Sequence, residues 1–88
     1  MKIWKYKFPI DDEFSLKMAD GIILDAQIQH GVPCMWVKTS GLPESIKLRR
    51  FAIIGTGHDF DARGLVYIAT FQMYDGALVW HLFERISG

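Results

Sequence analysis

The sequence predicts an all-β, or nearly all-β, fold: a small antiparallel sandwich or barrel of six to seven short strands. Polar and apolar residues alternate with a period of two through most of the chain, most clearly in Ile22–His30. Turn-forming pairs such as Asp20-Gly21 and Asp75-Gly76 separate the alternating segments. Since no segment combines helix caps with a sustained helical period, the pattern predicts no long helix.

The first half of the chain contains four predicted strands. They are Ile3–Phe8, Phe14–Met18, Ile22–His30 and Pro33–Lys38. In the third of them one face is apolar and the other is polar, as expected for a sheet with one solvated face. Pro9 ends the first strand, and the residues from His30 to Pro33 predict a hairpin connection between the third and the fourth.

The second half contains three more predicted strands. They are Ile46–Ile54, Leu65–Met73 and Ala77–Glu84. Loops are expected at Thr39–Ser45 and at Gly55–Arg63, the longest irregular stretch. The segment Leu65–Met73 fits either a helix or a strand, and its β-branched and aromatic residues favour a strand. The last strand is apolar on both faces, which predicts a central place in the core or a place in a subunit interface.

Length and composition limit the protein to one small domain, residues 1–88. A chain of this size buries only roughly 60–65% of the surface that its unfolded form exposes. Hydrophobic residues nevertheless make up 50% of it, and the net charge is zero. Both properties favour self-association, so we expect a homo-oligomer. The balanced charge also argues against binding to nucleic-acid polymers, which usually requires a basic excess.

The sequence contains no sign of export or membrane insertion. Cys34 is the single cysteine, so no internal disulfide can form. No apolar run approaches the roughly 18–20 residues that span a bilayer. The alternating lysines of Met1–Lys7 do not form the apolar core of a signal peptide. We therefore expect a cytoplasmic protein without a membrane partner.

The segment Gly55-Thr56-Gly57-His58 is the first candidate for ligand binding. It follows a predicted strand, and closely spaced glycines allow backbone N–H groups to converge on an anion. Its spacing matches neither of the established phosphate-binding fingerprints, and the acidic residues that follow it would repel a phosphate. The alternative interpretation is a tight turn with a bulge.

The sequence favours neither a metal site nor an enzyme. His30 and Cys34 are the only closely spaced pair of zinc-type ligands, and no second pair exists. Cys34 lies in a predicted strand, where a small buried apolar residue is the simpler interpretation than a nucleophile. The acidic candidates for acid–base catalysis lie mostly in predicted turns: Asp11, Asp12, Asp59, Asp61 and Glu84. We therefore expect no cofactor, no metal and no catalytic residue.

Aromatic residues are the second candidate feature, because they either pack the core or stack on a planar ligand. The large rings are Trp4, Tyr6, Trp36, Phe51, Tyr67 and Trp80. An arginine among Arg49, Arg50 and Arg63 is expected to hold the anionic end of such a ligand. The predicted ligand-binding residues are Trp36, Arg50, Gly55, Thr56, Gly57, His58, Tyr67, Trp80 and His81.

Several blocks of the sequence resemble a family of short uncharacterised proteins found mainly in tailed-phage and prophage genomes. They are Ile3-Trp4-Lys5-Tyr6, the stretch from Gln29 to Trp36, Arg50-Phe51, Gly55-Thr56-Gly57-His58, Tyr67-Ile68 with Thr70, and Leu78-Val79-Trp80-His81 with Phe83-Glu84. The resemblance covers nearly the whole chain and carries no assigned activity or site residue. It implies the context of a short phage accessory protein, which would act in the host cytoplasm.

These observations lead to one expected function and two alternatives. We expect a non-enzymatic counter-defence protein that, as a homo-oligomer, sequesters a small nucleotide-like ligand. The first alternative is an inhibitor or adaptor that contacts a host protein through an apolar face or a sheet edge. The second is a minor virion or assembly component. The likeness to small sequestering phage proteins is one of class and not of sequence.

Overall fold

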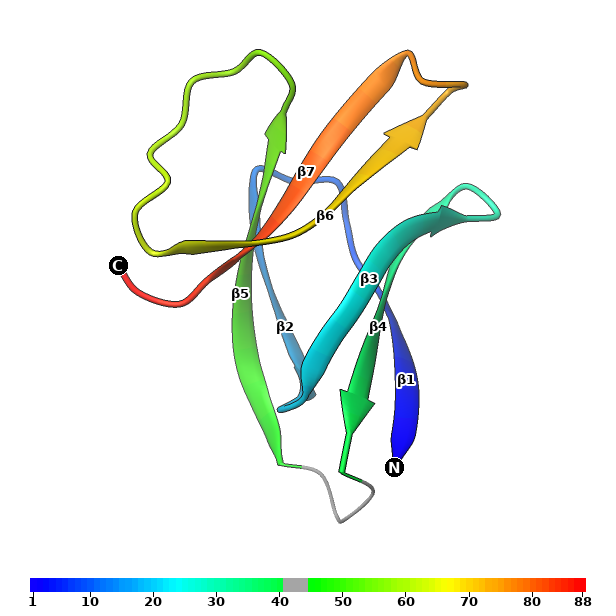
Figure 1. Cartoon of the computed structure of the whole chain (residues 1–88), viewed down its shortest axis with the longest axis vertical. Helices are drawn as coiled ribbons and strands as arrows, with labels where there is room; N and C mark the ends of the chain where they lie inside the picture. The colour runs from blue at the N-terminus through cyan, green and yellow to red at the C-terminus, as the bar shows by residue number, and fades with distance from the viewer. Residues whose placement is uncertain (41–44) are drawn as a thin grey trace.

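The computed structural model describes residues 1–40 and 45–88 and forms seven strands and no helix within them (Figure 1). The strands are β1 (Lys2–Lys7), β2 (Glu13–Ala19), β3 (Ile22–Gln29), β4 (Val32–Thr39), β5 (Ile46–Gly55), β6 (Leu65–Met73) and β7 (Leu78–Arg85). The all-β prediction is confirmed, and the ambiguous segment 65–73 is a strand. Of the predicted loop at 39–45, residues 41–44 lie outside the described part of the chain.

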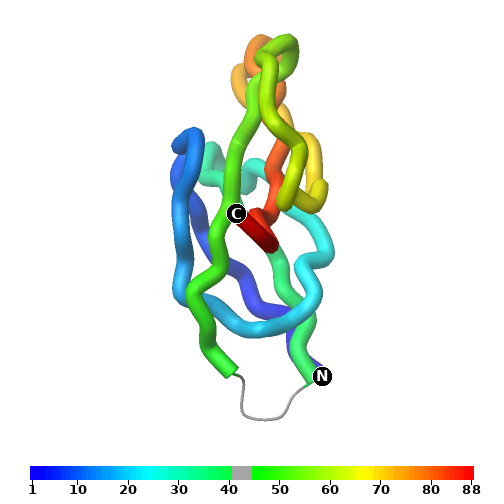
Figure 2. Tube along the Cα trace, turned by 90° about the vertical axis from the view of Figure 1, so that its left-hand side faces the viewer, coloured from blue at the N-terminus to red at the C-terminus, as the bar shows by residue number. Residues whose placement is uncertain are grey.

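The strands form a sandwich of two antiparallel sheets. One sheet has three strands in the order β1-β4-β3, and the other has four in the order β2-β5-β7-β6. The body is flat, with principal extents of 40 × 33 × 16 Å, as the side view in Figure 2 shows. A two-layer sandwich was one of the two architectures that the strand pattern predicted.

Two tight turns confirm the predicted hairpins. β3 and β4 are joined by His30 and Gly31, which have φ angles of 51° and 78°. Positive φ at both central positions is the type I′ geometry that suits the twist of paired strands. The turn between β6 and β7 likewise contains Tyr74, Asp75 and Gly76 with positive φ angles.

The core lies between the inner faces of the two sheets. Its largest fully buried side chains include Phe51, Phe71, Met18, Met35 and Leu82. Phe8, which follows β1, packs its ring 5.5 Å from the Phe14 ring and 5.8 Å from the Phe71 ring, between ring centroids. Because it comes from the connection between the sheets, this ring joins the two layers.

The central position of β7 explains why that strand is apolar on both faces. It lies between β5 and β6 in the four-stranded sheet. Its inner face places Leu82 in the core, fully buried, while its outer face carries the partly buried Phe83. The first of the two predictions for this strand, a central place, is therefore confirmed.

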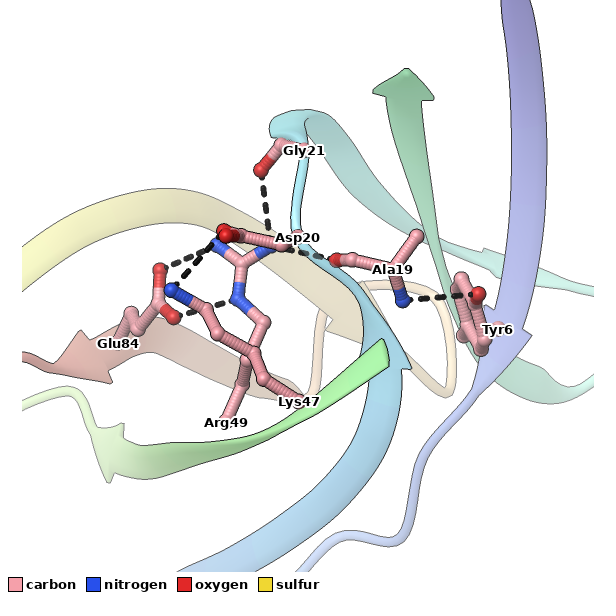
Figure 3. Close-up of polar contacts among 7 residues, drawn as sticks. All are labelled: Tyr6, Ala19, Asp20, Gly21, Lys47, Arg49 and Glu84. Carbon is pink, nitrogen blue, oxygen red and sulfur yellow. Dashed lines mark hydrogen bonds and ion pairs between the residues drawn. The ribbon is translucent and has the colours of Figure 1, made fainter. Parts of the chain in front are cut away.

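An ionic and hydrogen-bonded cluster fixes the corner at which the chain passes from β2 to β3 (Figure 3). Arg49 Nη1 donates to the carbonyls of Ala19, at 3.1 Å, and Gly21, at 2.8 Å. Its Nε and Nη2 donate to the two carboxylate oxygens of Glu84, both at 2.7 Å. The Ala19 N–H donates to the Tyr6 hydroxyl at 3.0 Å. This cluster connects both sheets.

Replacing Gly21 with alanine is expected to destabilise the fold by roughly 2–3 kcal/mol, the upper part of the range for overpacking. A Cβ at Gly21 would lie 2.3 Å from the Lys38 carbonyl oxygen, a backbone atom that cannot turn away. The matched control is Gly55→Ala, where the three atoms nearest to the new Cβ all belong to the His58 ring, the first of them at 3.3 Å. Urea denaturation measures both, and equal stabilities would contradict the steric account.

Candidate functional site

The outer face of the four-stranded sheet carries the candidate site. The loop from Thr56 to Gly64 leaves the end of β5 and returns to the start of β6 (Figure 1). The register pairs Tyr67 with Phe83 and Thr70 with His81. Cross-strand partners share a face, so all of them lie on the face opposite the core residue Leu82.

A β-bulge in β6 brings Tyr67 and Thr70 to the same face although they are three residues apart. The register shifts between Tyr67 and Ala69, so one residue of β6 has no partner on β7. Ala69 consequently faces the core and is buried. The Tyr67 hydroxyl and Thr70 Oγ1 then lie 2.7 Å apart on the outer face.

We call the hollow at this place the aromatic cavity. It measures about 260 Å³ and is lined by Ile54, Gly55, Thr56, Gly57, His58, Phe60, Tyr67, His81 and Phe83. Three of these residues are aromatic, and the Phe83 ring contacts the other two. The centroid of the Phe60 ring lies 5.4 Å from that of Phe83, and the centroid of the Tyr67 ring lies 5.7 Å from it. Ligand pockets for drug-sized molecules usually measure roughly 300–1,000 Å³, so the aromatic cavity has room for one small ring system.

A chain of hydrogen bonds runs along the side of the aromatic cavity. Thr70 Oγ1 lies 2.7 Å from the Tyr67 hydroxyl and 2.9 Å from His81 Nδ1. His81 Nε2 lies 2.7 Å from Thr56 Oγ1, which is 3.4 Å from the carbonyl of Val79. One proton arrangement satisfies all four contacts, with Tyr67 donating to Thr70, Thr70 to His81, His81 to Thr56, and Thr56 to Val79.

In this arrangement the hydroxyls of Tyr67 and Thr56 have no proton left to donate to a ligand and can only accept hydrogen bonds from it. Each hydroxyl has one proton, and each is used within the chain of contacts. The remaining lone pairs of these two oxygens are available as acceptors, and the His58 ring, which also lines the cavity, offers one N–H donor. The side of the cavity formed by Tyr67 and Thr56 therefore favours a ring that donates hydrogen bonds, such as one with an exocyclic amino group.

The Gly55–His58 segment forms a turn whose N–H groups are mostly used within the protein. The N–H of Thr56 donates to the Val79 carbonyl at 3.2 Å, and that of His58 donates to the Gly55 carbonyl at 3.2 Å. Gly57 has a φ of 88°, which is the left-handed region that glycine adopts readily. The geometry is the tight-turn alternative, and it does not point several N–H groups at one anion.

A second hollow, the acidic cavity, lies on the other side of Phe60. It measures about 460 Å³. Its charged lining residues are the carboxylates of Asp12, Glu13, Asp59 and Asp61 and the guanidinium groups of Arg63 and Arg85. The two guanidinium groups are already paired, Arg63 with Asp61 at 2.6 Å and Arg85 with Glu13 at 2.7 Å. Carboxylates therefore outnumber the cations, which disfavours a phosphate here.

Hydrogen bonds from Arg63 keep Asp61 ionised. The Arg63 guanidinium and then its backbone N–H hold the pKa of Asp61 below its ordinary value of 3.8, and the same pair raises the pKa of Arg63. Hydrogen bonding to the charged form of a carboxyl lowers its pKa. The acidic cavity thus keeps this negative charge to a lower pH than an ordinary aspartate would.

The structure brings most of the predicted ligand-binding residues together, but not all of them. Those that line the aromatic cavity are Gly55, Thr56, Gly57, His58, Tyr67 and His81. Trp80 lines a neighbouring hollow of about 440 Å³ with Gly55, Thr56 and His58. Arg50 lies further along the sheet beside Arg85, and Trp36 belongs to the three-stranded sheet.

Trp80 points to the inner face of its strand, because it pairs with the buried Phe71. Within the described residues, its indole Nε1 is buried and meets no hydrogen-bond partner. Cys34 is also buried, at 1% exposure, as predicted for a small apolar residue.

The arginines considered for an anionic ligand have other partners. Arg49 is buried against Glu84, and Arg63 pairs with Asp61. Arg50 lies 3.5 Å from the carbonyl oxygen of Gly88, through Nη2. None of the three lines the aromatic cavity. Across residues 1–40 and 45–88, no three His, Cys, Asp or Glu side chains gather where a metal ion could bind.

Three residues that line the aromatic cavity are not among those predicted from the sequence: Ile54, Phe60 and Phe83. Phe83 could have been found, because it lies two residues after His81 on the same strand and so on the same face. Phe60 lies in the loop and is 47% exposed; no periodicity predicts where such a side chain points.

The comparisons with known proteins identify a family but no close relative. The whole chain, residues 1–88, matches the family described as a domain of unknown function, DUF7352, and the protein belongs to that family. No curated protein and no solved structure matches it. The part of the chain that the structure describes holds no helix long and apolar enough to cross a membrane.

Proposed function

We propose that this member of the DUF7352 family is a non-enzymatic binding protein whose aromatic cavity takes the base of a small nucleoside-like ligand. The observation that carries the proposal is the aromatic cavity itself. The rings of Phe60, Phe83 and Tyr67 line it, and the hydroxyl oxygens of Tyr67 and Thr56 can accept hydrogen bonds from a ligand. Aromatic side chains stack on bases with roughly 1–3 kcal/mol per base.

The charges around the cavity narrow the ligand class. No lysine or arginine lines the aromatic cavity, and the acidic cavity beside it has more carboxylates than cations. A phosphate group would therefore gain nothing from these side chains. The ligand that fits is a nucleoside or free base with an amino group, and not a nucleotide held by its phosphate.

The biological context belongs to the same proposal. The homo-oligomeric state, the phage origin and a counter-defence role by sequestering the ligand are what composition and the family resemblance imply. Sequestration needs binding without turnover, and a stacking surface supplies such binding. The cytoplasm is the compartment in which free nucleosides would be met.

A thermal-shift series tests the ligand class, because saturating ligand must stabilise the fold. Adenosine is expected to raise the melting temperature more than purine riboside, which has no amino group and no other N–H on its base, and AMP is expected to stabilise no more than adenosine. If none of these compounds shifts melting at millimolar concentration, the proposal is wrong. A larger shift with AMP would place the site among the arginines instead.

A further inference from the structure

The outer face of the three-stranded sheet carries charge of the opposite sign to the acidic cavity. On β4, Trp36 lies between Lys5 of β1 and Asp25 of β3. Lys7 lies two residues from Lys5 on β1, and Lys38 lies two residues from Trp36 on β4, so both lysines occupy the same face. We call this surface, with three lysines around one tryptophan, the lysine face.

Among the described residues, one acid, Asp25, lies on the lysine face, and it does not cancel the charge of the three lysines. Asp25 Oδ1 accepts a hydrogen bond from the N–H of Ala26 at 2.8 Å, and the Gln27 side chain lies 3.3 Å from Oδ2. Lys5 donates to Gln29 Oε1 at 2.9 Å, a neutral acceptor. The lysine face therefore keeps a net positive charge.

Exposed apolar side chains border both surfaces. Ile3 and Ile22, which flank Lys38, are 59% and 63% exposed. Phe60, at the rim of the acidic cavity, is 47% exposed. Apolar residues of this size at a charged rim are typical of protein interfaces.

We propose that copies of this chain associate head to tail, with the lysine face of one copy seated on the acidic cavity of the next. The chain as a whole is neutral, so the segregated charges find their complement in a second copy. A symmetric contact through two lysine faces, or through two acidic cavities, would oppose like charges. The head-to-tail contact pairs opposite charges and covers apolar residues on both sides.

A head-to-tail contact determines which forms the assembly can take. A head-to-tail contact is heterologous, so each copy keeps one unused surface of each kind. Such contacts build rings when the rotation closes and open chains when it does not. This contact gives the homo-oligomer of the proposed function a definite interface, and it does not depend on what occupies the aromatic cavity.

A charge swap tests the contact by light scattering with size exclusion. The first variant is Lys5→Glu with Lys7→Glu, and the second is Asp12→Lys with Asp59→Lys; all of these side chains are exposed. Each variant alone is expected to be a monomer of about 10 kDa, because its two surfaces now carry the same sign. An equimolar mixture is expected to associate again, because each variant complements the other. Circular dichroism serves as the control that both variants remain folded.

Salt dependence and ligand binding complete the test. Wild-type association is expected to weaken from about 0.1 M to about 1 M salt, as the Debye length falls from about 10 Å to about 3 Å. A wild-type monomer at millimolar protein, association unaffected by salt, or a mixture that stays monomeric would each overturn the contact. Adenosine binding by the Lys5→Glu, Lys7→Glu variant is measured in parallel, so that failure of the contact and failure of the ligand proposal are told apart.

Discussion

Replacing Glu84 with alanine is expected to lower the free energy of unfolding by about 3 kcal/mol, the lower end of the range for breaking a buried ion pair. Arg49 and Glu84 are only 8% and 18% exposed at their side chains and share two hydrogen bonds of 2.7 Å. Without Glu84, a buried guanidinium would remain with only the carbonyls of Ala19 and Gly21 as partners.

The matched control for Glu84→Ala is Glu13→Ala. Glu13 also pairs with an arginine at 2.7 Å, but its side chain is 65% exposed. Exposed pairs contribute about 0–1 kcal/mol, so this variant should unfold close to the wild type in urea. Similar losses for the two variants would show that burial does not decide the strength of the pair at the β2–β3 corner.

Replacing Phe83 with leucine is expected to weaken adenosine binding by roughly ten- to a hundredfold, since one stacked ring contributes about 1–3 kcal/mol. Phe83 is the ring that contacts both Phe60 and Tyr67. Leucine keeps the apolar volume in the sheet, so most of the stability should remain. Isothermal titration measures the dissociation constant of each variant.

Tyr74→Ala is the control for this loss of affinity. Tyr74 is also aromatic and is 73% exposed, but it lies in the turn between β6 and β7 and does not line the aromatic cavity. Its removal should leave the dissociation constant unchanged. An equal loss in Tyr74→Ala would indicate non-specific stacking on exposed rings, and an unchanged Phe83→Leu would move the site elsewhere.

Most of the fold could be predicted from the sequence because a period of two is a direct consequence of strand geometry. The alternation in Ile22–His30 and the turn residues at Gly31 and Gly76 specify strands and hairpins locally. The arrangement of the sheets depends on contacts between distant residues. Nothing in the local pattern indicates that Arg49 joins the corner at Gly21 to Glu84.

The candidate site was predictable only in part, for physical reasons that differ by residue. Trp80 and His81 are neighbours on one strand, so they must point to opposite faces, and only His81 reaches the aromatic cavity. Arg50 precedes Ile54 by four residues on β5, about 13 Å at 3.3 Å per residue. Trp36 lies on a different sheet, which no sequence spacing could reveal.

The central claim is that the aromatic cavity binds a nucleoside-like ring, and an NMR titration of the labelled protein with adenosine tests it most directly. We expect the signals of Tyr67, His81 and Phe83 to shift progressively, while those of Trp36 on the other sheet do not move. Cavity signals that stay unchanged at millimolar adenosine, or shifts that gather around Trp36 instead, would contradict binding at the aromatic cavity.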